Sequence, residues 1–227
     1  MLKRVRQIIG GGLGQGARVI AESGNRLVGG ADLVLNLAGW QFPKNLRLRV
    51  VILRDEKGQP LAEAQAVLPS ILEMAAIFRR VAKVSLLPAD PIILTAPGPA
   101  PTPALDVRCE DGAWQEDFGP AGAYFRRLAA KNVSGRVTGY AEPVTVFIVR
   151  HISGKGGCSL GPLTNYATLK ASTLSRSQTL LAHEVGHACG LWHSPDPQNL
   201  MFAKKPGHEL ASWQVAVLRN SRHVTYL

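Results

Sequence analysis

The sequence predicts an α/β fold in a single domain of ordinary size. Strand-like and helix-like apolar patterns alternate along the chain, which is typical of α/β proteins. A length of 227 residues accommodates one compact core and leaves little room for a second large domain. The composition, with 46% hydrophobic and 19% charged residues, is too apolar for a wholly disordered chain.

The first two elements are a strand and a long helix. Residues 46–53, LRLRVVIL, alternate and then become continuously apolar, as expected of a strand that enters a buried sheet. A turn containing Gly and Pro follows at 57–60. Over residues 62–82, apolar side chains recur at spacings of three and four. This spacing predicts an amphipathic helix packed on the sheet, with a kink or a later start at Pro69.

The middle of the chain contains further strands and a second helix. Short apolar stretches at 84–87 and 92–94 predict strands, and the Pro-rich segment 97–103 predicts a loop. A helix is expected over 121–131. The run VTVFIV at 144–149 is the clearest buried strand, because it is almost uninterrupted in apolar residues.

The next stretch ends in another helix. The Gly-rich segment 154–161 predicts a flexible loop, and residues 163–169 predict a short edge strand. A helix over about 177–188 follows, with Thr173 or Ser175 as its N-cap.

Residues 1–40 are rich in glycine and poor in aromatics, so we expect an N-terminal extension or pro-segment ahead of a folded domain at 41–227. The GGGLGQG stretch lacks the spacing and the preceding strand of a dinucleotide loop. Lys3, Arg4 and Arg6 resemble the start of a signal peptide, but no long apolar stretch follows them. We therefore expect no cleavable signal.

The net charge of +10 raises the question of an anionic partner such as nucleic acid or acidic lipid. The Lys and Arg residues are spread in small groups with no run of five, so we expect a solvated basic surface and no nucleic-acid partner. No apolar run approaches the roughly 18 residues needed for a membrane helix, so no membrane span is expected.

The motif HEVGHACGLWH carries the chemistry. On a helix, His183 and His187 are four residues apart and project from the same face, so both imidazoles could bind one metal ion. Gly190 would let the chain turn after the helix, so that His193 approaches from another direction. Three nitrogen ligands with the fourth position open to water are typical of a catalytic zinc site.

Glu184 is adjacent to the first histidine and is the expected general base. A zinc ion would lower the pKa of its bound water toward about 7, and a nearby carboxylate could take the proton. The arrangement predicts the hydrolysis of an amide.

The chain resembles the metzincin metalloproteases, because residues 183–193 fit HExxHxxGxxH and Met201, in NLM, lies where metzincins have their Met-turn. Ser194 and the short spacing to Met201 are most similar to the matrixin branch. This resemblance implies a twisted, mixed five-stranded sheet with two packed helices, then a small C-terminal subdomain with a last helix over 211–221.

The resemblance also implies an upper subdomain at 41–190, a lower subdomain at 191–227, and a zinc-dependent endopeptidase acting on a protein or peptide. In it, Met201 would support the site beneath the zinc without binding it, and Gly190 would end the active-site helix. The family is usually secreted, and we expect a monomer.

The sequence departs from the family in two places. Ala203 stands where astacin-like enzymes have a tyrosine that reaches the zinc, and the cysteine motif of matrixin latency is not found. Cys109 and Cys158 could be buried thiols or a disulfide, and Cys189 is expected to be a core thiol.

Secondary metal sites are not expected. The spacing of His151, Asp106, Asp111 and Asp117 does not match the structural zinc and calcium sites of matrixins, so we expect one catalytic zinc alone. His208 is expected at the surface.

The resemblance further implies that an extended substrate pairs with an edge strand above the active-site helix. Residues 163–169 are the candidate strand. Its candidate substrate contacts are Leu163, Asn165, Tyr166 and Ala167.

Two alternatives stay open. The chain could be a basic zinc-containing protein that binds nucleic acid or an anionic surface, but Glu184 and the open fourth position argue against this. It could also be a zinc amidase that acts on a non-protein amide, such as a cell-wall peptide.

Overall fold

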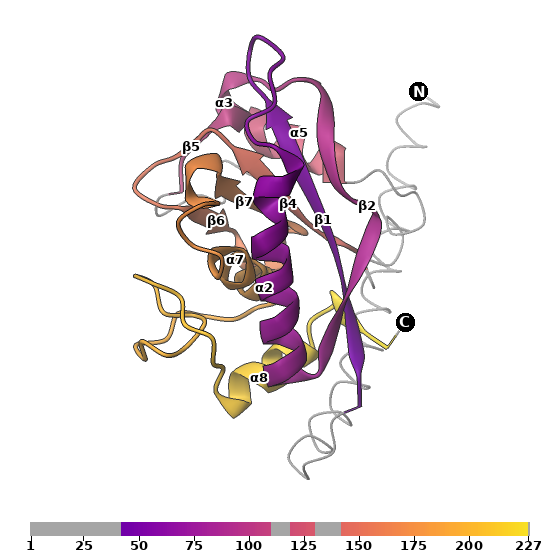
Figure 1. The fold of residues 1–227 in the computed structure, drawn as a ribbon, viewed down its shortest axis with the longest axis vertical. Coiled ribbons are helices and arrows are strands. Elements are labelled where there is room, and N and C mark those ends of the chain that lie inside the picture. Colours follow the sequence, from indigo (N-terminus) through magenta and orange to yellow (C-terminus); the bar gives the residue numbers. More distant parts are fainter. Residues whose placement is uncertain (1–41, 110–118, 130–141, 227) are drawn as a thin grey trace, which may run out of the picture.

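The computed structural model describes residues 42–109, 119–129 and 142–226, and it has the predicted α/β architecture with a mixed sheet (Figure 1). The strands follow the order β2-β1-β4-β7-β6 across the sheet, and β8 pairs with the start of β1. Their bounds are β1 Lys44–Arg54, β2 Val84–Pro99, β4 Val144–Val149, β6 Gly157–Ser159, β7 Tyr166–Lys170 and β8 Val224–Thr225. A separate pair joins β3 (Asp106–Val107) to β5 (His151–Ile152).

Helices cover both faces of the sheet. Their bounds are α2 Ala64–Ala82, α3 Thr102–Leu105, α5 Pro120–Ala129, α7 Leu180–Ala188 and α8 Ser212–Arg219, with short 3-10 turns at Gly161–Leu163 and Ala171–Thr173. In Figure 1, α2 lies along the sheet with α7 behind it, and α3 and α5 lie at the top of the view. The expectation of two packed helices therefore describes one face only.

The side chains of β1 point alternately to the two faces of the sheet, which explains these two layers. Leu48 and Val50 contribute to the core beneath α2 and α7, whereas Val51 and Leu53 contribute to the core beneath α3 and α5. Because both faces are covered, every residue of β4 is buried, as the run VTVFIV predicted.

The predicted edge strand is wrong. β7 pairs in parallel with β4 on one side and antiparallel with β6 on the other, so it lies inside the sheet. Among the described residues, the outermost strand on this side is β6, in the segment 154–161 that was predicted to be a loop. A three-residue strand among glycines has no alternating pattern, and it is held by its hydrogen bonds to β7.

The Pro-rich loop predicted at 97–103 is also wrong, since β2 continues to Pro99 and α3 begins at Thr102. Proline is accepted in β2 because that strand lies at the edge of the sheet, and it is accepted in the first turn of a helix because no N–H is needed there.

Helix α7 begins at Leu180, three residues later than predicted, and neither Thr173 nor Ser175 caps it. Thr179 occupies the N-cap position, and its hydroxyl donates to the carbonyl of Pro206 at 3.1 Å. Helix α2 begins before Pro69 and continues through it.

Of the two states left open for the cysteines, the structure has the disulfide between Cys109 and Cys158, and Cys189 is a buried free thiol. The extension predicted at 1–40 lies outside the described residues, as do Asp111 and Asp117. Within the described ranges, no helix combines the length and apolar character needed to cross a membrane.

Candidate active site

Helix α7 and the turn after it supply the three histidines. His183 and His187 come from α7, and His193 follows the turn at Gly190, whose φ of 93° is in the left-handed region that favours glycine. The N–H of Leu191 donates to the carbonyl of Gly186 at 3.0 Å, which fixes the change of direction. His183 and His187 therefore lie on one helix and the chain turns at Gly190, which is the backbone geometry that the spacing predicted.

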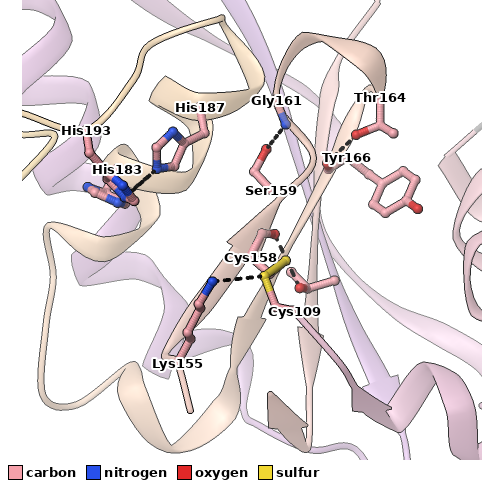
Figure 2. The surroundings of a disulfide bond; sticks show 11 residues. Cys109, Lys155, Cys158, Ser159, Gly161, Thr164, Tyr166, His183, His187 and His193 are labelled. Atoms are coloured by element: carbon pink, nitrogen blue, oxygen red, sulfur yellow. Dashed lines mark hydrogen bonds between the residues drawn. A yellow bond between two sulfur atoms is a disulfide. The ribbon is translucent and has the colours of Figure 1, made fainter. Parts of the chain in front are cut away.

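The three imidazoles converge on one point (Figure 2). The Nε2 atom of His187 lies 3.1 Å from Nε2 of His183 and 3.2 Å from Nε2 of His193. A tetrahedral zinc with nitrogen ligands at about 2.0–2.1 Å separates two ligand atoms by about 3.3 Å. The spacing of the trio matches that geometry.

Hydrogen bonds orient two of the rings. Nδ1 of His183 lies 2.8 Å from the carbonyl oxygen of Leu200, and Nδ1 of His187 lies 2.8 Å from that of Leu191. A carbonyl only accepts, so each Nδ1 carries the proton and each Nε2 presents a lone pair. Two lone pairs at 3.1 Å repel each other unless a cation lies between them, so the donor set fits a metal ion.

Burial keeps the imidazoles of His183 and His187 neutral. It lowers the pKa of His183, and it lowers the pKa of His187 to about 4, with the neighbouring His183 adding to the effect. Both imidazoles are therefore uncharged at pH 7, which is the form that binds a metal.

Glu184 is buried beside the trio on the same helix, at 5% exposed surface. Burial raises the pKa of its carboxyl to about 8, and the ammonium of Lys155 opposes the shift. A cation held by the histidines would favour the carboxylate form. The acidity of Glu184 would therefore be coupled to occupancy of the metal site.

Met201 is fully buried and lies against α7, where a Cβ atom added at Gly186 would lie 2.8 Å from its sulfur. Its N–H donates to Oδ1 of Asn199, and its carbonyl accepts from the N–H of Ser194, the residue after His193. Met201 thus links the third histidine to the helix that carries the other two.

The four candidate substrate contacts lie on or before β7, away from a free sheet edge. Ala167 pairs with Val146 on one side and Ser159 on the other, so its main chain has no room for a substrate strand. Tyr166 packs in the core beneath α5, 5.3 Å from the ring of Phe125.

Asn165 donates to Glu142 at 3.2 Å, and Leu163 lies in a 3-10 turn. The contacts of Leu163 and Asn165 with substrate stay predictions.

The secondary candidates are not brought to the site. Asp106 is paired with Arg150, which holds the pKa of that carboxyl below its usual range, and His151 is exposed on β5. His208 lies at the surface, as predicted, 3.2 Å from Glu73. Across residues 42–109, 119–129 and 142–226, the histidine trio is the only group of three or more His, Cys, Asp or Glu close enough to share an ion.

Sequence reasoning missed Gly157 and the strand that contains it. A Cβ atom added at Gly157 would overlap the side chain of Glu184. The only signal for this contact is the pair Gly156–Gly157 next to Cys158, in a segment that looks like a loop.

Comparison with solved structures identifies the class of fold. The chain is similar to metalloproteinase-II from Bacteroides fragilis with a TM-score of 0.51 at 15% identity, covering 80% of this chain and 54% of that one. It therefore spans about half the length of that chain. The likeness shows that this chain shares the fold of that part of the protein.

Two further solved chains are similar at lower TM-scores. A zinc-dependent peptidase from Methanocorpusculum labreanum has a TM-score of 0.45 at 14% identity, with 74% of this chain and 99% of that one covered. Mature mirolysin from Tannerella forsythia, solved with a cleaved peptide, has a TM-score of 0.49 at 9% identity, with 79% and 91% covered. No family model and no curated protein sequence matches the chain.

Proposed function

We propose that this protein is a zinc-dependent endopeptidase. The observation that carries the proposal is the trio His183, His187 and His193, whose Nε2 atoms converge at 3.1 and 3.2 Å while carbonyls orient two of the rings. The metallopeptidase-like fold supports it.

The three histidines would hold the zinc through Nε2. When bound, zinc supplies a Lewis acid that polarises a substrate carbonyl and lowers the pKa of a coordinated water toward about 7. The carbonyls of Leu200 and Leu191 keep the imidazoles in the tautomer that presents Nε2. Met201 packs beneath the helix as an apolar support.

Glu184 is the proposed general base and then the general acid. Its carboxylate takes a proton from the attacking water and delivers it to the departing amine. Ala203 stands where a tyrosine could otherwise stabilise the oxyanion, so we propose no protein hydroxyl from that position in this role.

The proposed substrate is an extended peptide that pairs with β6. This strand ends the sheet among the described residues, and it contacts Glu184 through Gly157. Main-chain hydrogen bonds to an open edge favour an extended peptide. We therefore propose β6, in place of residues 163–169, as the strand that pairs with the substrate.

Three finer features belong to the proposal. Ser194 after His193 supports the matrixin branch. The disulfide supports an oxidising compartment, because such bonds form and persist there. We also propose that the chain acts as a monomer on a protein or peptide.

The test compares cleavage of casein by wild type, Glu184→Gln and Glu184→Ala, with zinc content measured on each. We expect one zinc per chain in all of them, and a rate at least about 10²-fold lower in the variants. Glu63→Gln changes an exposed carboxyl at the start of α2 and is the matched control that keeps full activity. Full cleavage by Glu184→Gln would refute the proposed mechanism.

A further inference from the structure

Gly157 of β6 lies directly against the side chain of Glu184. A Cβ atom added at Gly157 would lie 2.6 Å from Cγ and 2.7 Å from Cδ of Glu184, and it would also overlap Oε1. Separations below about 3.0 Å are repulsive for carbon atoms, whose contacts are optimal at about 3.5–4.0 Å. The Glu184 side chain therefore occupies the space that any larger residue at 157 would fill.

Position 157 takes a glycine because a side chain would have no space there. Gly157 is not among the described glycines with a positive φ, so its backbone conformation is open to other residues. By contrast, Gly154 and Gly161, at either end of the same segment, have φ of 66° and 67°. A Cβ atom added at either of them would meet no atom within 3.0 Å. The three atoms nearest to a Cβ atom at position 157 all belong to the Glu184 side chain, so alanine there would overlap Glu184.

The strand cannot move away to relieve an overlap. Gly157 pairs with Leu169 in the ladder to β7, and the N–H of Lys170 donates to the carbonyl of Gly156 at 2.8 Å. The next residue, Cys158, is joined to Cys109, and Figure 2 shows this disulfide on the strand beside the helix that carries the histidines. β6 is thus held by its ladder to β7 and by the disulfide.

Glu184 cannot move as a whole either. Its backbone belongs to α7 between His183 and Val185, and all three residues are buried. The only freedom left is rotation of its side chain. The bare backbone at Gly157 therefore leaves the space that the Glu184 side chain occupies, and a Cβ atom there would force that side chain to rotate.

We propose that Gly157 is a positioning residue for Glu184, holding the carboxyl in the orientation from which it transfers protons. This rests on the proposed function, in which Glu184 is the general base. In this role Gly157 acts only through the Glu184 side chain. It acts because the bare main chain of β6 provides a flat surface for the Glu184 side chain.

A stability cycle on the full-length, metal-free chain tests the contact without any reference to cleavage. Gly157→Ala should lower the melting temperature of wild type by several degrees, on the order of 5 °C. In the Glu184→Ala background the overlapping atoms are gone, so Gly157→Ala should then cost little or be stabilising. An equal loss in both backgrounds would overturn the proposal, whether or not the chain is a peptidase.

Cleavage tests the positioning role. With zinc bound and casein-derived peptide as substrate, Gly157→Ala should lower kcat by about 10²-fold, because a displacement of about 1 Å has that effect. The zinc content should be unchanged, and KM should change far less than kcat. Loss of kcat/KM through KM alone would assign Gly157 to substrate pairing and overturn the positioning role.

Gly98→Ala is the matched control. Gly98 lies in β2 at the opposite edge of the sheet, and a Cβ atom added there meets nothing within 4 Å. This variant should keep wild-type stability and kcat. If Gly98→Ala lost as much of either as Gly157→Ala does, the effect at 157 would be a general effect of glycine replacement in the sheet, and the proposal would fall.

Discussion

The sulfur of Met201 lies against the bare backbone of Gly186, where an added Cβ atom would lie 2.8 Å from it. Gly186 is on α7, one residue before His187. The helix and the loop that follows it are therefore in close contact directly at the histidine trio. Both the space at Gly186 and the shape of Met201 are needed for this packing.

Replacing Met201 tests that packing. Met201→Ala removes a fully buried side chain and should lower the free energy of unfolding by about 2–5 kcal/mol, whereas Met201→Leu keeps the volume and should cost less than about 1.5 kcal/mol. Urea denaturation of the metal-free chain measures both. Equal costs for the two variants would contradict the packing role.

Zinc should stabilise the folded chain through the histidine trio. Adding zinc to about 100 times its dissociation constant should stabilise wild type by about 2.7 kcal/mol, since the metal binds the folded state. His187→Ala removes the central ligand and should abolish most of this shift, whereas His208→Ala, outside the trio, should keep it. Thermal melts with zinc and with chelator decide between these outcomes.

His223 should make the stability depend on pH. It is fully buried, donates from Nδ1 to the carbonyl of Glu142 at 3.1 Å, and accepts at Nε2 from Arg222. Burial lowers its pKa from 6.5 to about 4, with Arg222 adding to the effect. Between these values the unfolded chain binds more protons, so stability falls as the pH is lowered through this window and levels off below about pH 4.

The size of this effect is about 3 kcal/mol between pH 7 and pH 4. Over the same pH range, the free energy of unfolding of His223→Gln should fall by less than that of wild type, and the difference should equal this amount. Urea denaturation in the presence of chelator measures both proteins. His183 and His187 also titrate, but they are present in both proteins and cancel in the comparison. Parallel pH profiles would refute the assignment to His223.

Opening the disulfide should destabilise the chain. Cys109 and Cys158 are 49 positions apart, and closing a loop of that size stabilises by about 4 kcal/mol in the chain-entropy model. The double variant Cys109→Ser/Cys158→Ser should be less stable than wild type by about this amount, and its stability should no longer depend on reductant. Cys189→Ala, which removes only the free thiol, should respond to reductant as wild type does.

The strong local patterns predicted much of the fold. The run VTVFIV became β4 with the predicted bounds, and the amphipathic stripe over 62–82 became α2. Each depends on a periodicity within one segment, which a sequence displays directly. β6 and β8 were missed because strands of two or three residues are stabilised by their partners and carry no period of their own.

The sequence by itself determined the histidine trio, because His183 and His187 need only a helix and His193 needs only the turn at Gly190. Only the tertiary structure decided what surrounds them. The carbonyl of Leu200 that orients His183 and the Gly157 backbone that packs on Glu184 come from segments 17 and 27 residues away along the chain (200 − 183 and 184 − 157). Such contacts depend on how separate elements pack, and no local spacing encodes that packing.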